Sequence, residues 1–266
     1  MKIIVCVKQV PDTSGKVAVN PDGTLDRASM QTITNPDDLN AVEAALKLKD
    51  ETGCKVIIVT MGPPPAEGML REILARGADE AVLVSGREFG GSDTYATSQI
   101  LAAAINRIGV EKDDIVMCGR QAIDGDTAQV GPQIAEKLGL PQVSYAAEIK
   151  KEGDVITVQR MLEDGYMTIK VQTPCLITCI KELNEPRYMS VGGIFECYSK
   201  PYEIYDYETL KNDPLIDPTT IGLKGSPTNV YKSFSPPLKG AGVILDGSPA
   251  ESVEKLFAAL TEKHII

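Results

Sequence analysis

The feature that most constrains the fold is a regular alternation of short β-branched runs and helical patterns from residue 2 to about residue 180. Four strand–loop–helix units follow one another and place strands at 2–8, 55–60, 80–85 and 114–118. Consecutive units of this kind form a parallel sheet that is covered by helices on both faces. We therefore predict an α/β protein with a Rossmann-type, parallel-core sheet.

Local signals place the helices and the later strands. Asn35 can cap a helix that begins at Pro36, and Gly53 ends this helix. The other helices of the four units are expected at 66–76, 93–107 and 127–138. Further strands are expected at 142–149, 155–161, 167–172 and 175–180. Short turns at Gly153 and Gly165 favour a mixed or antiparallel continuation of the sheet.

One end of this sheet is the expected ligand site, because such folds bind ligands beyond the carboxyl ends of strands, where the strand order reverses. The strongest local feature is the segment 119–131, which follows the fourth strand and begins with glycine. Glycine lets a ligand approach the backbone, and free N–H groups at the next helix start favour a phosphate. Further donors there are Arg120, Thr127 and Gln129. Asp124 and Asp126 repel phosphate and suit helix capping or ribose hydroxyls, so the segment alone also fits a plain turn and cap.

Two other segments reach the same end of the predicted sheet. Residues 89–94 follow the third strand and open a helix, where Asp93 or Thr94 also suits a simple N-cap. Residues 6–12 leave the first strand and share a crevice with the fourth if the sheet reverses between them. Neither a G-x-G-x-x-G nor a P-loop pattern occurs, so a nucleotide requires a different version of the α/β sheet.

Composition narrows the chemistry. The only histidine is His264, which excludes a histidine triad, metal cluster or general base from the body of the chain, and we predict no metal site. Lys+Arg 27 against Asp+Glu 37 gives a net charge of −10, which disfavours nucleic acid. No apolar run approaches the roughly 20 residues of a membrane span and no signal peptide is recognisable, so a cytoplasmic location is expected. The six cysteines suit small buried hydrophobes, and we expect a bound cofactor to carry any chemistry.

The sequence changes character after Leu183. Residues 199–248 are rich in Pro, Gly, Asp, Ser and Thr with few periodic apolar residues, which favours an extended arm. A capping box at 248–251 then opens a helix. One face of this helix carries Val253, Leu256, Phe257 and Leu260. The helix either folds back on its own domain or docks on a partner subunit, and we favour the partner. The expected domains are 1–198 and 199–266.

Five motifs occur in an order and spacing that resemble the β subunit of electron-transfer flavoproteins. They are Val7-Lys-Gln-Val-Pro-Asp12, Asn35-Pro36, Met61-Gly-Pro63, the segment 119–132, and Leu183-Asn-Glu-Pro-Arg-Tyr188. The last two are specific, and together the five span essentially the whole chain. The resemblance implies an adenine-nucleotide-hydrolase-like sheet and a heterodimer with an α subunit that carries FAD.

The resemblance also implies which residues hold the nucleotide. In this family the β-subunit site holds AMP in simple electron carriers and a second FAD in electron-bifurcating members. By match to the family motifs, the contacts fall on Cys6, Asn35, Pro36, Asp37, Asp38, Met61, Gly119, Arg120, Gln121, Ala122, Ile123, Asp124, Gly125, Asp126, Thr127, Ala128, Gln129 and Val130.

Two short motifs favour FAD over AMP. Bifurcating members resemble this chain at Val10-Pro-Asp-Thr13 and at Gly91-Ser-Asp-Thr94, where small residues leave room for a diphosphate. The additional site residues are then Ser92, Asp93 and Thr94. The implied function is to take hydride from NADH, passing one electron to ferredoxin or flavodoxin and the other through the α-subunit FAD to an acyl-CoA dehydrogenase. The alternatives are a simple electron carrier with structural AMP and a nucleotide-binding module without a redox role.

The segment at about 181–198 resembles the loop with which the family recognises an acyl-CoA dehydrogenase. Val191 stands where an apolar anchor is expected, and Tyr188 and Ile194 flank it. Gly192 and Gly193 follow the anchor, whereas many members place proline nearby. The arm beyond this loop resembles the segment that embraces the FAD domain of the α subunit.

Overall fold

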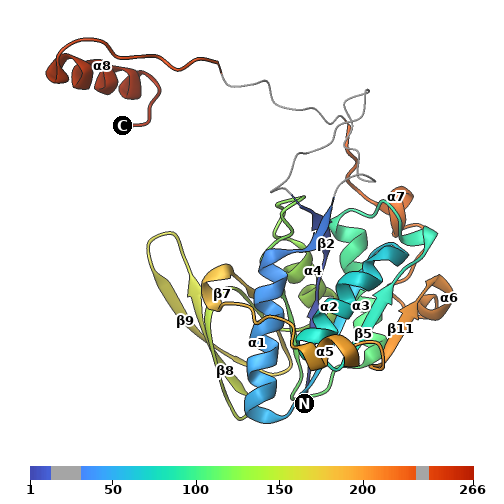
Figure 1. Ribbon diagram of the computed structural model, residues 1–266. Helices are drawn as coiled ribbons and strands as arrows, with labels where there is room; N and C mark the ends of the chain where they lie inside the picture. Colours follow the sequence, from blue (N-terminus) through green and yellow to red (C-terminus); the bar gives the residue numbers. More distant parts are fainter. Residues whose placement is uncertain (13–30, 232–239) are drawn as a thin grey trace.

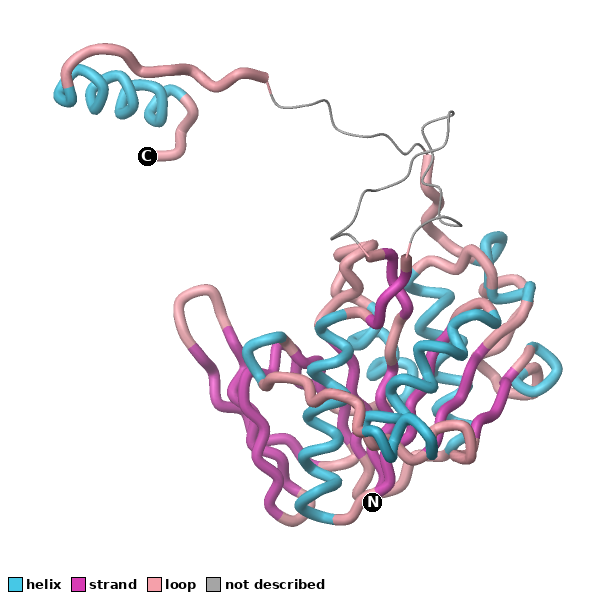
Figure 2. Tube along the Cα trace, in the orientation of Figure 1, coloured by secondary structure: helices cyan, strands magenta, loops and turns pink. Residues whose placement is uncertain are grey.

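The computed structural model describes residues 1–12, 31–231 and 240–266 and is built around one nine-stranded sheet (Figures 1 and 2). Its strands, in chain order, are β1 (Lys2–Cys6), β4 (Lys55–Met61), β5 (Glu80–Val84), β6 (Ile115–Gly119), β7 (Gln142–Glu152), β8 (Val155–Met161), β9 (Tyr166–Gln172), β10 (Cys175–Cys179) and β11 (Tyr202–Tyr205). Across the sheet they lie in the order β11-β5-β4-β1-β6-β10-β7-β8-β9. Neighbours from β11 to β7 are parallel, whereas β8 and β9 are antiparallel additions. The predicted α/β fold with a parallel core is confirmed.

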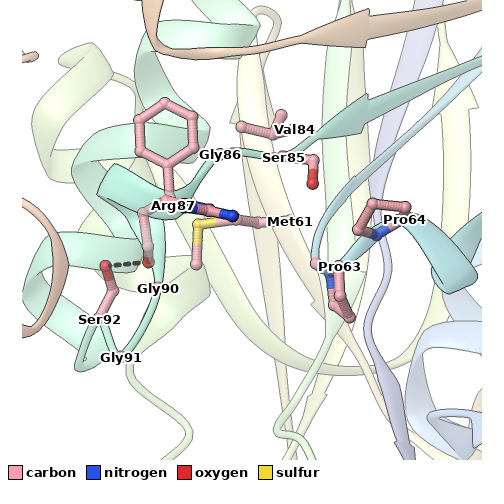
Figure 3. A pocket seen from close by; sticks show the side chains of 12 residues that line it. Met61, Pro63, Pro64, Val84, Ser85, Gly86, Arg87, Gly90, Gly91 and Ser92 are labelled. Carbon is pink, nitrogen blue, oxygen red and sulfur yellow. Dashed lines mark hydrogen bonds between the residues drawn. The ribbon is translucent and has the colours of Figure 1, made fainter.

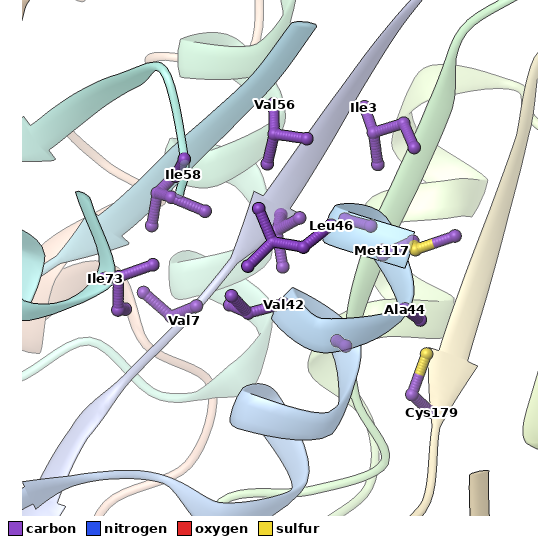
Figure 4. Close-up of a cluster of buried hydrophobic side chains, with 14 of the residues drawn as sticks. Ile3, Val7, Val42, Ala44, Leu46, Val56, Ile58, Ile73, Met117 and Cys179 are labelled. Carbon is purple, nitrogen blue, oxygen red and sulfur yellow. The ribbon is translucent and has the colours of Figure 1, made fainter. Parts of the chain in front are cut away.

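Helices cover both faces of the sheet. α1 (Pro36–Thr52) and α2 (Glu67–Arg76) pack on one face, and α3 (Thr94–Ile108) and α4 (Val130–Leu138) pack on the other. Because side chains alternate along a strand, Ile3 of β1 faces the first pair of helices and Ile4 faces the second. Figure 4 shows the first of these hydrophobic layers, where side chains of α1 meet those of the central strands.

The strand order reverses at β1. From β1 the chain runs outward through β4 and β5 and then returns to β6 on the other side of β1. In the register, Cys6 of β1 lies between Val59 of β4 and Cys118 of β6. The carboxyl ends of β1 and β6 are therefore neighbours, which is the arrangement that the sequence analysis required for a shared crevice.

Beyond β1 the chain forms a short antiparallel pair of strands, which the sequence did not predict. It joins β2 (Gln9–Pro11) to β3 (Thr32–Thr34), directly before α1. Thr13, part of the motif that favoured FAD, lies outside the described residues.

The chain after residue 198 stays on the body for longer than predicted. β11 adds in parallel to the outer edge of β5. Two short helices follow it, α6 (Tyr207–Leu210) and α7 (Gly222–Gly225). Tyr205, Leu210 and Ile221 are buried in the same layer as α3. The prediction of an extended arm throughout 199–248 is therefore wrong for the first part of this segment. A few irregularly spaced apolar residues are enough for it to cover the edge of the sheet.

The C-terminal helix α8 (Pro249–Glu262) lies apart from the sheet (Figure 1). The predicted capping box between Ser248 and Glu251 is present. None of its residues is buried, and Phe257 is 63% exposed, so α8 does not fold back on the body. Its docking on a partner stays a prediction. Within the described ranges, no helix has the length and apolar character that crossing a membrane requires.

Candidate functional site

A cavity of about 310 Å³ opens where the central strands end. Cys6 from β1, Met61 from β4 and Gly119 from β6 contribute to its floor. Its walls are the start of α3 and the loop between β6 and α4. The reversal of strand order thus produces a cleft beside two helix N-termini, whose N–H groups attract phosphate.

The loop between β6 and α4 is irregular, and α4 begins at Val130 rather than at Thr127 as predicted. Asp126 and Ala128 have φ angles of 49° and 52°, a left-handed conformation that does not continue into a helix. Within the described parts of the chain, the backbone N–H groups from Thr127 to Gly131 have no hydrogen-bond partner. A row of free N–H groups around left-handed residues forms a concave anion site, so this segment fits a phosphate.

Asn35 holds this loop instead of capping α1. Its buried side chain donates to the carbonyl oxygen of Gln121 at 2.8 Å and accepts from the N–H of Ile123 at 3.1 Å. The predicted capping role is wrong, because the Asn35 side chain accepts no hydrogen bond from a backbone N–H at the start of α1. Pro36 and Gly53 do begin and end the helix as predicted.

Asp38 joins the ends of the two central strands. Its Oδ2 accepts from the backbone N–H of Lys8 and its Oδ1 from that of Gly119, both at 2.8 Å. Burial raises the pKa of Asp38 to about 7, although these hydrogen bonds act in the opposite direction. The neighbouring Asp37 pairs with Arg120 at 3.2 Å and so holds the guanidinium at the edge of the cavity.

The two carboxylates that argued against a phosphate are both engaged by other side chains. Nζ of Lys8 lies 2.8 Å from Asp124, and Gln121 donates to Asp126 at 2.8 Å. Lys8 therefore brings a positive charge to the cavity that the sequence analysis did not select. Its place directly after the first strand, at the predicted reversal, was the signal that could have found it.

Ser92, Asp93 and Thr94 line the cavity, but their side chains have protein partners. Ser92 donates to the carbonyl oxygen of Phe89 at 2.8 Å, and Thr94 donates to Gln129 at 3.0 Å. Asp93 caps α3 through its carboxylate, as one of the two readings of this segment predicted. Donation from Ser92 or Thr94 to a diphosphate therefore requires exchange of one of these bonds.

Most of the predicted nucleotide contacts line this cavity. They are Cys6, Asp38, Met61, Ser92, Asp93, Thr94, Gly119, Arg120, Gln121, Ala122, Gly125, Thr127, Ala128, Gln129 and Val130. The predicted residues outside the lining are Asn35, Pro36, Asp37, Ile123, Asp124 and Asp126. Lining residues that were not among the predicted nucleotide contacts are Val7, Lys8, Thr97, Leu101, Cys118 and Gly131. Val7, Lys8 and Gly131 lie in segments that the sequence had placed at the cleft, whereas only the topology brings Thr97, Leu101 and Cys118 there.

The thiols on the floor of the cavity stay protonated. Burial raises the pKa of Cys6 to about 12 and the pKa of Cys118 well above its ordinary value. All six cysteines are free and buried, in agreement with their interpretation as small hydrophobic side chains. Because the thiolate is the nucleophilic form, these residues contribute packing to the floor and no nucleophile.

A second cavity of about 560 Å³ adjoins the first (Figure 3). Met61 and Ser92 line both, so the two spaces meet beside the end of β4. Its walls come from the turn 61–64 and the loop 84–92. In Figure 3 the Arg87 side chain extends toward Met61, and no acidic group in the described residues forms an ion pair with it. The second cavity thus adds space and a positive charge to the site.

The predicted partner-recognition residues are all exposed. Tyr188 is 90% exposed and Val191 is 75% exposed, while Ile194 lies on the same short helix, α5 (Val191–Glu196). This helix packs closely on α2, because a β-carbon on Gly193 would overlap the carbonyl oxygen of Ala75. Gly193 is therefore a packing requirement of the loop.

The chain before α5 is fastened to α1. Arg187 pairs with buried Glu43 at 2.9 Å and with Asp50 at 2.8 Å. Asn40 and Asn184 exchange side-chain-to-backbone hydrogen bonds of 2.7 and 2.9 Å. These bonds fix the position of the chain that leads to the exposed residues Val191 and Ile194.

The fold and the cleft define an α/β protein whose ligand site lies at the reversal of strand order, with free N–H groups above a glycine-containing floor. Residues 22–200 match the electron transfer flavoprotein domain. The chain is 68% identical to the acryloyl-CoA reductase electron transfer subunit gamma of Anaerotignum propionicum and 54% identical to the caffeyl-CoA reductase-Etf complex subunit CarD of Acetobacterium woodii. It is 49% identical to the electron transfer flavoprotein subunit beta of Clostridium acetobutylicum, and 100% of both chains is covered in all three comparisons. The chain belongs to the electron transfer flavoprotein family, among the β subunits that its motifs predicted.

Proposed function

We propose that this chain is the β subunit of a heterodimeric, electron-bifurcating flavoprotein and that its cleft holds FAD. When bound, FAD would supply the redox chemistry of this function, namely acceptance of hydride from NADH and delivery of one electron to ferredoxin or flavodoxin and of the other, through the α-subunit FAD, to an acyl-CoA dehydrogenase. The chain itself offers no histidine in its body and no exposed thiol, because the only histidine is His264 and all six thiols are buried. Its residues therefore bind and orient the cofactor and leave the reaction to it.

The family relationship supports this proposal. The two most similar relatives described above are named as an electron transfer subunit of an acryloyl-CoA reductase and as a subunit of a caffeyl-CoA reductase-Etf complex. Identities of 68% and 54% over full length favour a shared architecture of the cleft. Both names describe a subunit that belongs with a reductase of an acyl-CoA substrate.

The second cavity is the observation that favours FAD over AMP. An adenylate fits the first cavity, with its phosphate at the free N–H groups from Thr127 to Gly131. AMP ends there, whereas FAD continues through a second phosphate and needs a further large space for its ring system. The cavity of about 560 Å³ beyond Met61 and Ser92 supplies such a space, and Arg87 places a positive charge in it.

Two exposed surfaces support assembly into a larger complex. Val253, Leu256 and Phe257 form an apolar face on α8 that suits the α subunit. The surface formed by Tyr188, Val191 and Ile194 suits the acyl-CoA dehydrogenase. We place the complex in the cytoplasm, where six unpaired thiols are stable.

The nucleotide content of the heterodimer tests this proposal. The chain is coexpressed with its α subunit, purified, incubated with excess FAD and freed of unbound nucleotide. FAD and AMP are then released by denaturation and quantified. We expect two FAD per heterodimer and no AMP. One FAD with one AMP identifies a simple electron carrier instead, and a colourless chain that needs no partner identifies a module without a redox role.

A further inference from the structure

The loop 86–94 has a different neighbour on each of its two faces. One face lines both cavities, with Arg87 in the second, Thr94 in the first and Ser92 in both. The other face bears the segment 222–228, which leads from α7 toward the C-terminal arm (Figure 1). The same loop is therefore a wall of the site and the support of the arm.

The segment 222–228 is bound closely to this loop. Leu223 donates its N–H to the carbonyl oxygen of Gly90 at 2.9 Å, and Gly222 donates to Oγ of Ser92 at 3.1 Å. A β-carbon on Gly91, whose φ is +74°, would lie 2.9 Å from Cβ of Leu223. Because Gly91 and Leu223 leave no room for even a methyl group between them, a displacement of one segment at this point displaces the other.

Asp93 makes the outermost of these contacts. Its Oδ2 accepts from both the N–H and the hydroxyl of Thr228, at 2.9 and 2.7 Å. Its backbone N–H donates to the buried hydroxyl of Ser226 at 2.8 Å. Its Oδ1 meanwhile caps α3 by accepting from the N–H of Ala96 at 3.0 Å. One carboxylate thus joins the helix start beside the cleft to the root of the arm.

Among the described residues, Thr228 is the last one at which the arm is bound to the body. From Asn229 onward, the described residues make no hydrogen bond or ion pair with the α/β body, and Val230 is 85% exposed. On the side of the cleft, Thr94 donates to Gln129 at 3.0 Å and connects the loop to the start of α4. A continuous set of bonds therefore runs from the arm through Asp93 to both walls of the nucleotide cavity.

We propose that Asp93 is a positioning residue that couples the arm to the cleft, so that a nucleotide in the cleft and a partner subunit on the arm strengthen each other's binding. Both need the same arrangement of the loop 86–94, and whichever binds first orders it for the other. Such coupling is reciprocal, so it is measurable from the nucleotide side alone. The inference rests on the proposed function only in taking the α subunit as the partner of the arm.

The affinity for AMP tests the coupling, because AMP carries the adenylate that is common to both candidate cofactors. Calorimetry gives the affinity of the nucleotide-free full chain alone and of its nucleotide-free heterodimer with the α subunit. For the wild type we expect AMP to bind the heterodimer about fivefold or more tightly than the single chain. In Thr228→Val, which removes the hydroxyl donor to Asp93, this ratio should fall toward one.

Thr219→Val is the matched control. Thr219 donates its N–H and hydroxyl to Asp217 at 2.8 and 2.7 Å, the same pair of bonds, but Asp217 lines neither cavity, whereas Asp93 lines the first. Its ratio should equal that of the wild type. A wild-type ratio of one, or a Thr228→Val ratio equal to the wild type, would overturn the coupling.

Hydrogen exchange gives a second readout that needs no partner subunit. AMP should slow exchange at the amides of 222–228 in the wild-type chain and should have no such effect in Thr228→Val. Equal slowing in both proteins contradicts the role of Asp93. Neither measurement depends on flavin, so a heterodimer that contains AMP in place of the second FAD refutes the proposed function and leaves the coupling standing.

Discussion

Gly119 and Asp38 lie in direct contact at the floor of the cleft. The N–H of Gly119 donates to Oδ1 of Asp38 at 2.8 Å, and a β-carbon on Gly119 would lie 2.7 Å from the backbone nitrogen of Asp38. This contact closes the junction between β6 and the start of α1. It is possible only without a side chain at position 119, which explains why glycine ends the strand.

Gly119→Ala should therefore destabilise the protein and weaken nucleotide binding. The added methyl group would meet the backbone of Asp37 at 2.6 Å, and overpacking of this kind costs about 1–3 kcal/mol. Urea denaturation and AMP titration measure the two effects. Gly125→Ala is the control from the same loop, because nothing lies within 4 Å of a β-carbon there. Equal stability of the two variants would show that position 119 has no need of glycine.

The unfolding free energy should depend on pH through Asp38. Burial raises its pKa from 3.8 to about 7 in the folded protein. Between these values the folded state holds a proton that the unfolded state has lost. The contribution of Asp38 to stability is therefore full below pH 3.8 and is lost as the pH rises to about 7, by at most about 1.4 kcal/mol per pH unit. Denaturation of the wild type and Asp38→Asn at several pH values measures this slope, and parallel profiles contradict the prediction.

Thr127→Val should reduce the affinity for a nucleotide without changing stability. Thr127 is exposed, lines the cleft and has no hydrogen-bond partner in the described residues, so its hydroxyl is free for a ligand. Loss of one hydrogen bond to a phosphate weakens binding by roughly 1–2 kcal/mol. AMP titration measures the affinity and thermal unfolding without ligand is the control. An unchanged affinity would mean that the hydroxyl does not contact the nucleotide.

Arg87→Gln should distinguish FAD from AMP as the guest of the cleft. Of the two cavities of the site, Arg87 lines only the second, so its removal should weaken retention of FAD and leave AMP affinity unchanged. The expected loss is about 1 kcal/mol, because the side chain is exposed to solvent. Arg107→Gln is the matched control, since this guanidinium stacks on Tyr205 and lines neither cavity. Equal FAD retention by both variants would show that Arg87 does not contribute to the binding of FAD.

Gly193→Ala should impair recognition of the acyl-CoA dehydrogenase and spare nucleotide binding. Its methyl group overlaps the carbonyl oxygen of Ala75, so α5 must shift together with Val191 and Ile194. Gly192→Ala is the control, because nothing lies within 4 Å of a β-carbon at that position. Binding of the dehydrogenase to the immobilised heterodimer measures the effect. Equal binding by both variants would show that the seat of α5 on α2 has no influence on recognition.

Sequence alone determined the parallel core, its helices and the end of the sheet where the cleft lies. These features follow from patterns within one segment, such as the apolar run of the first strand or the Pro36 and Gly53 signals of α1. The energies concerned are those of neighbouring residues, so they are visible in the order of amino acids.

Tertiary structure decided which chemical group each polar side chain meets. The Asn35 side chain does not cap α1 as predicted but donates to the carbonyl oxygen of Gln121, which lies 86 positions away. β11 pairs with β5 at the edge of the sheet. Lys8 contacts Asp124 across 116 positions, and the second cavity forms where the turn 61–64 meets the loop 84–92, two segments that are distant in the sequence. Hydrogen bonds between distant segments depend on where the whole sheet places them, and no local pattern contains that information.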